Sequence, residues 1–580
     1  MVVITNIIGL WGEEFSVEET PLKNKQILKK SKEKKEIKTV EKAVRSKSLS
    51  VDEKMTLIEE DVNRILGSYK THTQTIRTYN DFVWYINRCI SNGVVSIDTE
   101  TDNSLNTFDC KLMGLCLYSP GLNNAYIPVN HIDRITNELL PSQITEEQIR
   151  EQLERCSETF KIFHNATFDI EVIKQTCGIK LKADWDTMVG AQLLDENEQK
   201  GLKTQYKLHI DPDQDKYDIE HLFKGLPYAI FEPELFALYA ATDAWETYKL
   251  YEYQKTIFER PENKDVYDLF KNIEIPIIDV VVDMELTGVE VDVDYAKRLS
   301  KVYHERSDEI QLRIGDELAR LKPIIDNWRQ TKEANTPEKI RPKKPGSGLY
   351  VPDDEKFPFS DELGLYRLAS KTPNQQLADP PELGSPTQMA ILLYDVLKCP
   401  VVDKKSPRGT GADILEALAE EVPLCKLLVE KRGVDILINT FIDKMPEILQ
   451  KDGRVHARFN NCGTATGRFS SSDPNLQNIP SHAKDIRLMF KASKGYSIVG
   501  GDFGAQEPRS LASLSKDTDM INAYKEGKDL YAVIASKCFH NDYYDNLEFD
   551  KNGNLQPEGK ARRSRAKQAF LGEYNCPFTK

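Results

Sequence analysis

The sequence predicts a multidomain α/β protein, and three observations lead to this expectation. At 580 residues the chain is long enough for several domains, each with its own core. Between residues 76 and 262, short apolar runs typical of strands alternate with helical segments. From 263 to 451 the pattern is mainly helical, and from 452 a stretch rich in Gly and Ser precedes another strand-like run and further helices.

The amino-acid composition indicates the broad class of protein. Hydrophobic residues make up 40% of the chain and charged residues 29%, which is typical of a soluble globular protein. No apolar run is long enough to span a membrane, and the start has no basic segment of the signal-peptide kind, so we expect no membrane contact and a cytoplasmic protein. The ten cysteines form no CxxC pair, which predicts buried reduced thiols. The net charge of −14 argues against a protein that merely coats nucleic acid, although a cleft can still concentrate cations.

Residues 1–75 are expected to form a basic, largely disordered N-terminal arm. Residues 23–47 hold eleven Lys and Arg against three Glu, and such a run is most often a solvated segment. A short helical pattern follows at 51–69.

The segment 76–262 predicts a mixed sheet covered by helices. Strand-like runs are GVVSIDTET, CKLMGLCLYS, NAYIPVN and FKIFHN, with the helical TEEQIREQLERC before the last of them. The helix LFALYAATDAWETYKLYEYQK closes the domain. Within 263–451, residues 323–386 are rich in Pro, Lys and Asp, so we expect an irregular insertion there.

Two acids lie two residues apart on the first of these strands. Period-two alternation places Asp98 and Glu100 on one face, with Thr99 on the other. Neighbouring carboxylates repel each other unless a cation lies between them, and a divalent metal with oxygen ligands is the natural partner. Taken alone the pair is a weak signal, because exposed Asp-x-Glu pairs are common.

Two later segments strengthen the signal. Asn165 and Asp169 lie four residues apart just after a strand-like run, and Tyr239 and Asp243 lie four apart on a helix face. Acids from three separate segments can converge on a two-metal site that hydrolyses phosphodiesters.

Together these motifs resemble, in order and spacing, those of the DEDDy 3′–5′ exonucleases, the proofreading domains of DNA polymerases, which have a ribonuclease-H-like sheet. The resemblance implies two Mg²⁺ or Mn²⁺ ions held by Asp98, Glu100, Asp169 and Asp243. It also implies that Tyr239 orients the attacking water and that Asn165 supports a single-stranded 3′ end.

The second half resembles the family A DNA polymerases. The segments DMELTGVEVDVDYAKRL, SPTQMAILLYDVL and KLLVEKRGVDILINTFIDKMP are similar to the palm entry and thumb, which places these parts at 263–451. TATGRFSSSDPNLQNIP, at 464–480, is close to the family signature. Its side-chain donors suit the sugars, phosphates and minor-groove edges of a primer–template, and they are Arg468, Asn475, Gln477 and Asn478.

Residues 452–580 would then be a partial palm and fingers. GGDFGAQEPRSLASLS aligns with polymerase motif A, which implies that Asp502 binds the catalytic metals, Glu507 packs against the incoming sugar and Arg509 supports the motif. The form with Gly504 and Pro508 is more similar to bacteriophage polymerases than to the common bacterial form.

RSRAK, at 563–567, is similar to the start of the fingers helix that grips the incoming dNTP. Arg563 and Lys567 lie one turn apart, a spacing that suits a triphosphate, and Leu571 stands where the family usually has an aromatic residue.

The resemblance stops after Gly572. None of the nine histidines is followed by Asp, so the His-Asp-Glu turn that provides the second metal-binding aspartate in this family is not present. We expect a polymerase gene that is split or interrupted by an intron, its palm completed by a second exon or chain. The alternatives are an artificial truncation and a natural short protein that only holds DNA.

The sequence therefore predicts a family A DNA polymerase that acts in DNA replication, with a complete proofreading exonuclease and a truncated polymerase part. Its implied partners are primer–template DNA, single-stranded 3′ ends and, once complemented, a dNTP. The origin would be a bacteriophage, and the location the host cytoplasm. A stand-alone exonuclease and a non-catalytic primer–template-binding subunit are the alternatives. GNLQPEGKAR does not have the spacing of a phosphate-binding loop, which argues against an ATP-driven enzyme.

Overall fold

The computed structural model describes residues 6–8, 14–16, 49–67, 72–102, 104–335, 340–342, 365–367, 377–480 and 483–574. The basic stretch 23–47, most of the Pro-rich segment expected at 323–386, and residues 575–580 lie outside this description. The chain forms two compact units, which span 1–491 and 492–580. Among the described residues, no helix combines the length and the apolar character needed to cross a bilayer.

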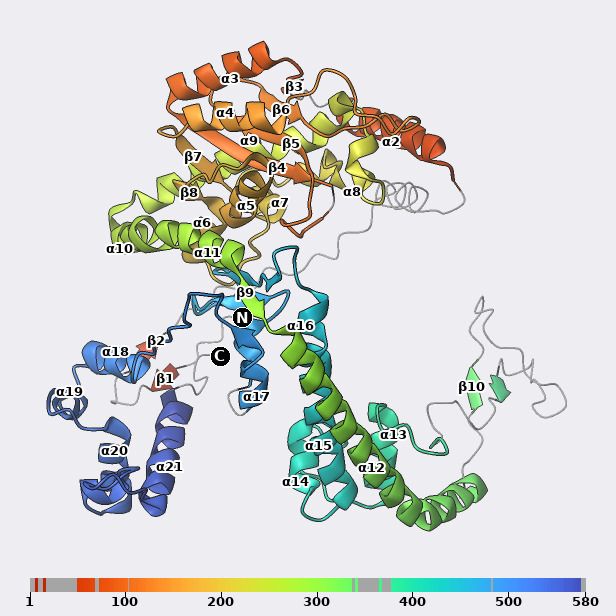
Figure 1. Cartoon of the computed structure of the whole chain (residues 1–580), viewed down its shortest axis with the longest axis vertical. Coiled ribbons are helices and arrows are strands. Elements are labelled where there is room, and N and C mark those ends of the chain that lie inside the picture. The colour runs from red at the N-terminus through yellow and green to blue at the C-terminus, as the bar shows by residue number, and fades with distance from the viewer. Residues whose placement is uncertain are drawn as a thin grey trace. The chain divides into compact units, whose positions relative to one another are not determined.

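A mixed six-stranded sheet forms the centre of the N-terminal part (Figure 1). Strand β5 runs antiparallel to both of its neighbours, whereas the other neighbouring pairs are parallel. The sheet begins at Thr73, just before the domain start expected at residue 76. In spatial order its strands are β3 (Thr73–Thr75), β6 (Asn124–Pro128), β5 (Leu112–Tyr118), β4 (Val94–Thr101), β7 (Phe160–Phe163) and β8 (Trp185–Asp186).

Helices cover this sheet. Every residue of β5 and β6 is buried, which agrees with sequences that are apolar apart from Asn124 rather than alternating. The long helix α9 (Pro233–Phe258) packs along β3, β6, β5 and β4, so the helix expected in this segment is confirmed. The other helices here are α2 (Val51–Leu66), α3 (Tyr79–Asn92), α4 (Glu146–Arg155), α5 (Ala166–Cys177), α6 (Thr187–Leu194), α7 (Leu202–His209) and α8 (Glu220–Phe223).

A second core belongs to the helical region that follows. The 43-residue helix α12 (Val293–Asn335) packs against α15 (Pro423–Leu437). The expected irregular segment starts later than residue 323, because α12 continues through Pro323 to Asn335. Buried Leu321 and Ile325 flank the proline and anchor the helix, and this packing outweighs the hydrogen bond lost at Pro323.

Shorter elements complete the first unit. Strands β12 (Arg454–Val455), β9 (Val289–Val291) and β15 (Phe490–Lys491) form a three-stranded sheet, and β13 (Arg458–Asn460) pairs with β14 (Ser470–Ser472) as a hairpin. The remaining helices are α10 (Lys264–Leu269), α11 (Ile275–Thr287), α13 (Pro386–Ala390), α14 (Ala412–Leu418), α16 (Lys444–Glu447) and α17 (Lys484–Arg487). Two small strand pairs are β1 (Asn6–Ile8) with β2 (Glu14–Ser16) and β10 (Ile340–Pro342) with β11 (Leu365–Arg367).

The second unit is helical, with α18 (Gln506–Ser515), α19 (Thr518–Lys525), α20 (Leu530–Phe539) and α21 (Pro557–Tyr574). The strand expected at GYSIVGGDF is wrong, because residues 496–503 form irregular backbone. Ile498 and Val499 are 66% and 92% exposed. A strand needs neighbours for its backbone N–H and C=O groups, and within the described residues no strand pairs with this segment.

Candidate active site

Two of the expected acids lie on the central strand β4, beside a thiol on its neighbour. Asp98 pairs in register with Cys116 of β5, and Glu100 pairs with Gly114. One ligand atom from each of Asp98, Glu100 and Cys116 lies within 4.8 Å of the other two. The expectation that both carboxylates share one face therefore agrees with the structure.

The third acid reaches the same strand from helix α5. Asn165 adopts a left-handed backbone at φ 69° immediately before this helix, which lets the chain turn sharply out of β7. Asp186 accepts hydrogen bonds from the backbone N–H groups of Asn165 and Ala166, at 3.2 and 2.7 Å, and so fixes the first turn. One turn later, Asp169 Oδ1 accepts from the backbone N–H and the hydroxyl of Thr99, at 2.9 and 2.6 Å.

The fourth acid and the tyrosine come from helix α9. Asp243 and Tyr239 are one turn apart, and the ring of Tyr239 stacks on Phe223 at a centroid distance of 5.3 Å. Asp243 Oδ1 is in close contact with the ammonium group of Lys203 on α7. The same ammonium donates to Glu246 Oε2 at 3.0 Å.

The pKa values of these acids are raised, because burial and neighbouring carboxylates disfavour the ionised form. Burial raises the pKa of Asp98 well above its usual range, and repulsion from Asp169, Asp243 and Glu100 adds to the effect. Burial and the charge of Asp243 likewise raise the pKa of Glu100. Burial raises the pKa of Asp169 to about 7, although the Thr99 hydrogen bonds oppose this rise. The four acids therefore lie within electrostatic reach of one another.

This donor set fits divalent cations. Carboxylate oxygens are the ligands that Mg²⁺ and Mn²⁺ prefer, and four clustered acids lose their mutual repulsion when cations lie between them. The cysteine adds a softer potential ligand that the sequence motifs did not indicate.

Tyr239 lies beside the acids in a largely buried position. Burial raises the pKa of its hydroxyl well above 10, and the charges of Glu100 and Asp243 contribute to the same shift. The phenol therefore stays protonated at neutral pH and can donate a hydrogen bond, but it cannot serve as a base.

The sequence missed Lys203, Glu246 and Asp186. Burial raises the pKa of Glu246 to about 7, and Gln214 donates to its second oxygen at 2.9 Å. The i, i+3 spacing of Asp243 and Glu246 on one helix face was a signal that could have revealed the extra carboxylate. Lys203 could not have been found in this way, because only tertiary packing brings α7 against α9.

The expected primer–template residues lie on and after the β13–β14 hairpin. Arg468 is exposed in its loop. Asn475 Oδ1 accepts from the backbone N–H of Gln477 at 3.1 Å, and Gln477 Nε2 donates to the Phe469 carbonyl at 3.2 Å. Asn478 is exposed. Local hydrogen bonds thus shape this segment, with Arg468 and Asn478 reaching solvent.

In the second unit, the motif A residues surround the start of α18. Asp502 is exposed in the irregular segment before the helix, and Glu507 lies half-buried in the first turn. Arg509 donates to the Gly504 carbonyl at 3.0 Å, and its guanidinium lies 4.3 Å from the centre of the Tyr524 ring.

The expected nucleotide-binding residues share one stretch of α21. The guanidinium of Arg563 pairs with Asp529 at 2.8 Å and lies 5.5 Å from the centre of the Tyr531 ring. The ammonium of Lys567 lies 5.7 Å from the same ring centre, while Leu571 is half-buried one turn further on. The two cations therefore share one helix face, as their spacing predicted.

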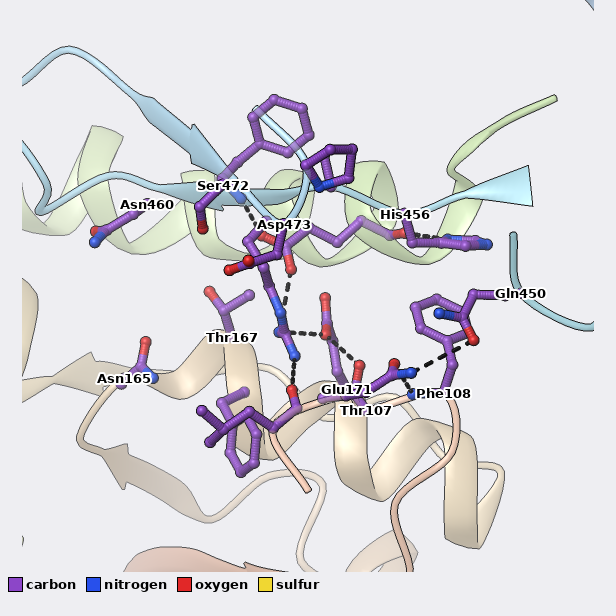
Figure 2. A pocket seen from close by; sticks show the side chains of 18 of the residues that line it. Thr107, Phe108, Asn165, Thr167, Glu171, Gln450, His456, Asn460, Ser472 and Asp473 are labelled. Atoms are coloured by element: carbon purple, nitrogen blue, oxygen red, sulfur yellow. Dashed lines mark hydrogen bonds and ion pairs between the residues drawn. The ribbon is translucent and has the colours of Figure 1, made fainter. Parts of the chain in front are cut away.

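A pocket of about 610 Å³ opens beside α5, between the sheet domain and the β13–β14 hairpin (Figure 2). Arg458 crosses it and donates to Glu171 at 3.0 Å, to Glu285 at 3.3 Å and to the Leu105 carbonyl at 2.5 Å. Asn165 lies on the wall of this pocket. One guanidinium thus joins helix α5, which carries Asp169, to helix α11 and to the hairpin.

Comparisons with known proteins match both parts of the chain. A model described as "3'-5' exonuclease" matches residues 73–257, and a model described as "DNA polymerase family A" matches residues 364–551. DNA polymerase I of Chloroflexus aurantiacus is 30% identical over 389 residues, which cover 65% of this chain and 35% of that protein. DNA polymerase I of Borreliella burgdorferi is 26% identical over 540 residues, covering 92% of this chain and 50% of the relative.

A solved structure, the POL domain of Pol1 from M. smegmatis in complex with DNA primer-template and dNTP, shares the fold with a TM-score of 0.59 at 19% identity. The alignment covers 86% of this chain and 71% of that one. The chain spans half or less of the two curated relatives described above. By these matches, residues 73–257 are similar to the 3′–5′ exonuclease family and residues 364–551 are similar to DNA polymerase family A.

Proposed function

We propose that the N-terminal part hydrolyses single-stranded DNA from the 3′ end in a reaction that depends on Mg²⁺ or Mn²⁺. The observation that carries this proposal is the convergence of four acids from β4, α5 and α9 beside a half-buried tyrosine. The exonuclease model matched to residues 73–257 supports it independently.

The residues divide the work as follows. Asp98, Glu100, Asp169 and Asp243 hold the divalent ions, and bound ions would lower the pKa of an attacking water and stabilise the leaving oxygen. The protonated hydroxyl of Tyr239 orients that water by a hydrogen bond. Thr99 keeps Asp169 against β4, so that acids from two elements stay in one fixed arrangement.

The test is release of nucleotides from a single-stranded oligonucleotide labelled at its 5′ end, with Mg²⁺, Mn²⁺ or EDTA. We expect stepwise shortening from the 3′ end with either metal and none in EDTA. Combining Asp98→Ala with Glu100→Ala abolishes shortening, whereas the control that combines Glu147→Ala with Glu154→Ala, two exposed acids of α4, retains it. Hydrolysis by the purified Asp98/Glu100 double variant at the wild-type rate would refute the site.

We further propose that the second half is a DNA-directed DNA polymerase segment that binds primer–template and dNTP. The family A model matched to residues 364–551 supports this role, and Asp502 is the proposed metal ligand. Arg468, Asn475, Gln477, Asn478 and Arg509 would contact DNA, and Glu507, Arg563, Lys567 and Leu571 the nucleotide.

Templated synthesis, on this proposal, needs a second metal-binding carboxylate beside Asp502, which a second exon or chain would supply. Primer extension by this chain alone would overturn that requirement. The form of motif A with Gly504 and Pro508 favours a bacteriophage origin, and the protein would then act in the host cytoplasm. Bacteriophage genes on either side of this gene would support that origin.

A further inference from the structure

Lys203 occupies an unusual position for a cation. Its ammonium lies against Asp243 and 3.0 Å from Glu246, and the lysine side chain is only 23% exposed. Glu246 is more deeply buried, with a side chain 1% exposed. The lysine is therefore neither a surface residue nor part of an ordinary exposed ion pair.

The position of Lys203 is built by the fold. Helix α7 packs along α9, which brings the lysine opposite the turn that contains Asp243 and Glu246. Gln214 donates to the other oxygen of Glu246 at 2.9 Å and so fixes that carboxylate. Lys203 also borders a small cavity of about 30 Å³ that is lined by Tyr239 and Glu220 as well.

Asp243 is at the same time one of the four acids of the proposed metal site. An Mg²⁺ ion bound to a carboxylate oxygen lies about 2.0–2.1 Å from it, and an ammonium in contact with the same oxygen repels the ion and competes with it for the negative charge. Lys203 and a divalent ion therefore compete for Asp243 Oδ1.

We propose that Lys203 is an internal counter-ion of the exonuclease site, which neutralises Asp243 and Glu246 in the metal-free protein and is displaced when a divalent ion binds. This inference rests on the proposed function in that it takes the four acids to be a metal site. Lys203 is thus a positioning residue: it keeps the acidic cluster from opening before the metal arrives, and it weakens the affinity for that metal.

The direct test uses the wild-type protein and amine labelling read by mass spectrometry. We expect Lys203 to be protected in EDTA and its labelling to rise severalfold when Mn²⁺ is added. Lys207 lies on the same helix and forms an exposed pair with Asp215, so its labelling stays unchanged and provides the internal control. Labelling of Lys203 that Mn²⁺ leaves unchanged or lowers would overturn the proposal.

A variant gives a second, independent readout. Lys203→Met lowers the melting temperature in EDTA by about 3 °C or more, because two carboxylates lose their counter-ion. It binds Mn²⁺ about tenfold more tightly in a titration followed by electron paramagnetic resonance. Lys207→Met changes neither quantity. Unchanged or weaker Mn²⁺ binding by folded Lys203→Met refutes the counter-ion role, whereas failure of the wild type to bind Mn²⁺ at all refutes the metal site itself.

Discussion

Replacing Arg458 with methionine tests how the β13–β14 hairpin is held against the exonuclease domain. The methionine keeps most of the apolar stem but removes the guanidinium from two carboxylates whose side chains are only 1% and 4% exposed, those of Glu171 and Glu285. Removing one partner from a buried ionic group costs about 3–5 kcal/mol, because the remaining charge stays buried without compensation. For a domain of this size the loss corresponds to a fall of about 6–20 °C in melting temperature.

The pKa of Glu171 sharpens this expectation. Burial and the neighbouring Glu285 raise it to about 8, so the Glu171 carboxyl is largely protonated at pH 6 and ionised at pH 9. The loss of stability in Arg458→Met is therefore smaller at pH 6 than at pH 9. Thermal unfolding at both pH values, followed by far-ultraviolet circular dichroism, measures the difference.

The control for Arg458 is Arg320→Met. Arg320, whose side chain is 63% exposed, forms two hydrogen bonds with Glu317 on α12, and an ion pair with a solvent-exposed partner contributes at most about 1 kcal/mol. Adding Glu285→Gln to Arg458→Met removes the repulsion and recovers part of the stability. A loss below about 1 kcal/mol at pH 9, or no recovery in the double variant, would refute the idea that Arg458 neutralises this pair.

Three further outcomes follow from the site. Tyr239→Phe keeps the ring packing but loses the hydroxyl, so we expect exonuclease hydrolysis to slow about 10²-fold with unchanged stability, and a normal rate would exclude the hydroxyl from orienting water. In EDTA the protein should melt at a lower temperature at pH 8 than at pH 5.5, because a carboxyl group such as Asp169, with its pKa raised from 3.8 to about 7, loses its stabilising contribution as the pH rises through that window. Asp98→Asn reduces this difference in melting temperature between pH 5.5 and pH 8. A difference equal to that of the wild type would argue against the clustered acids as its cause. Arg563→Ala weakens binding of a fluorescent dNTP about tenfold, whereas Arg562→Ala, whose guanidinium bonds Asn546 and the Asp545 carbonyl, leaves it unchanged; equal effects would refute the assignment.

The sequence predicted the exonuclease sheet and its acids well because the signals are local. Asp98 and Glu100 lie on one strand, and Tyr239 and Asp243 on one helix, so spacing alone places each pair. Lys203 and Arg458 could not be predicted, since each meets its partners only after helices distant in the sequence have packed. The strand expected at 496–503 failed for a related reason: a strand is stable only beside other strands, and apolar composition does not supply them.

The attachment of the β13–β14 hairpin bears on how this chain can be divided into fragments. Cys462 packs against the exonuclease core, and Gln192 Nε2 donates to the Thr464 carbonyl at 3.1 Å. The exonuclease domain thus takes part of its outer cover from a segment about 200 residues beyond its closing helix. A fragment that ends at residue 262 exposes that surface to water. We therefore expect that a fragment must extend past Ser472 for its exonuclease domain to be as stable as in the full chain.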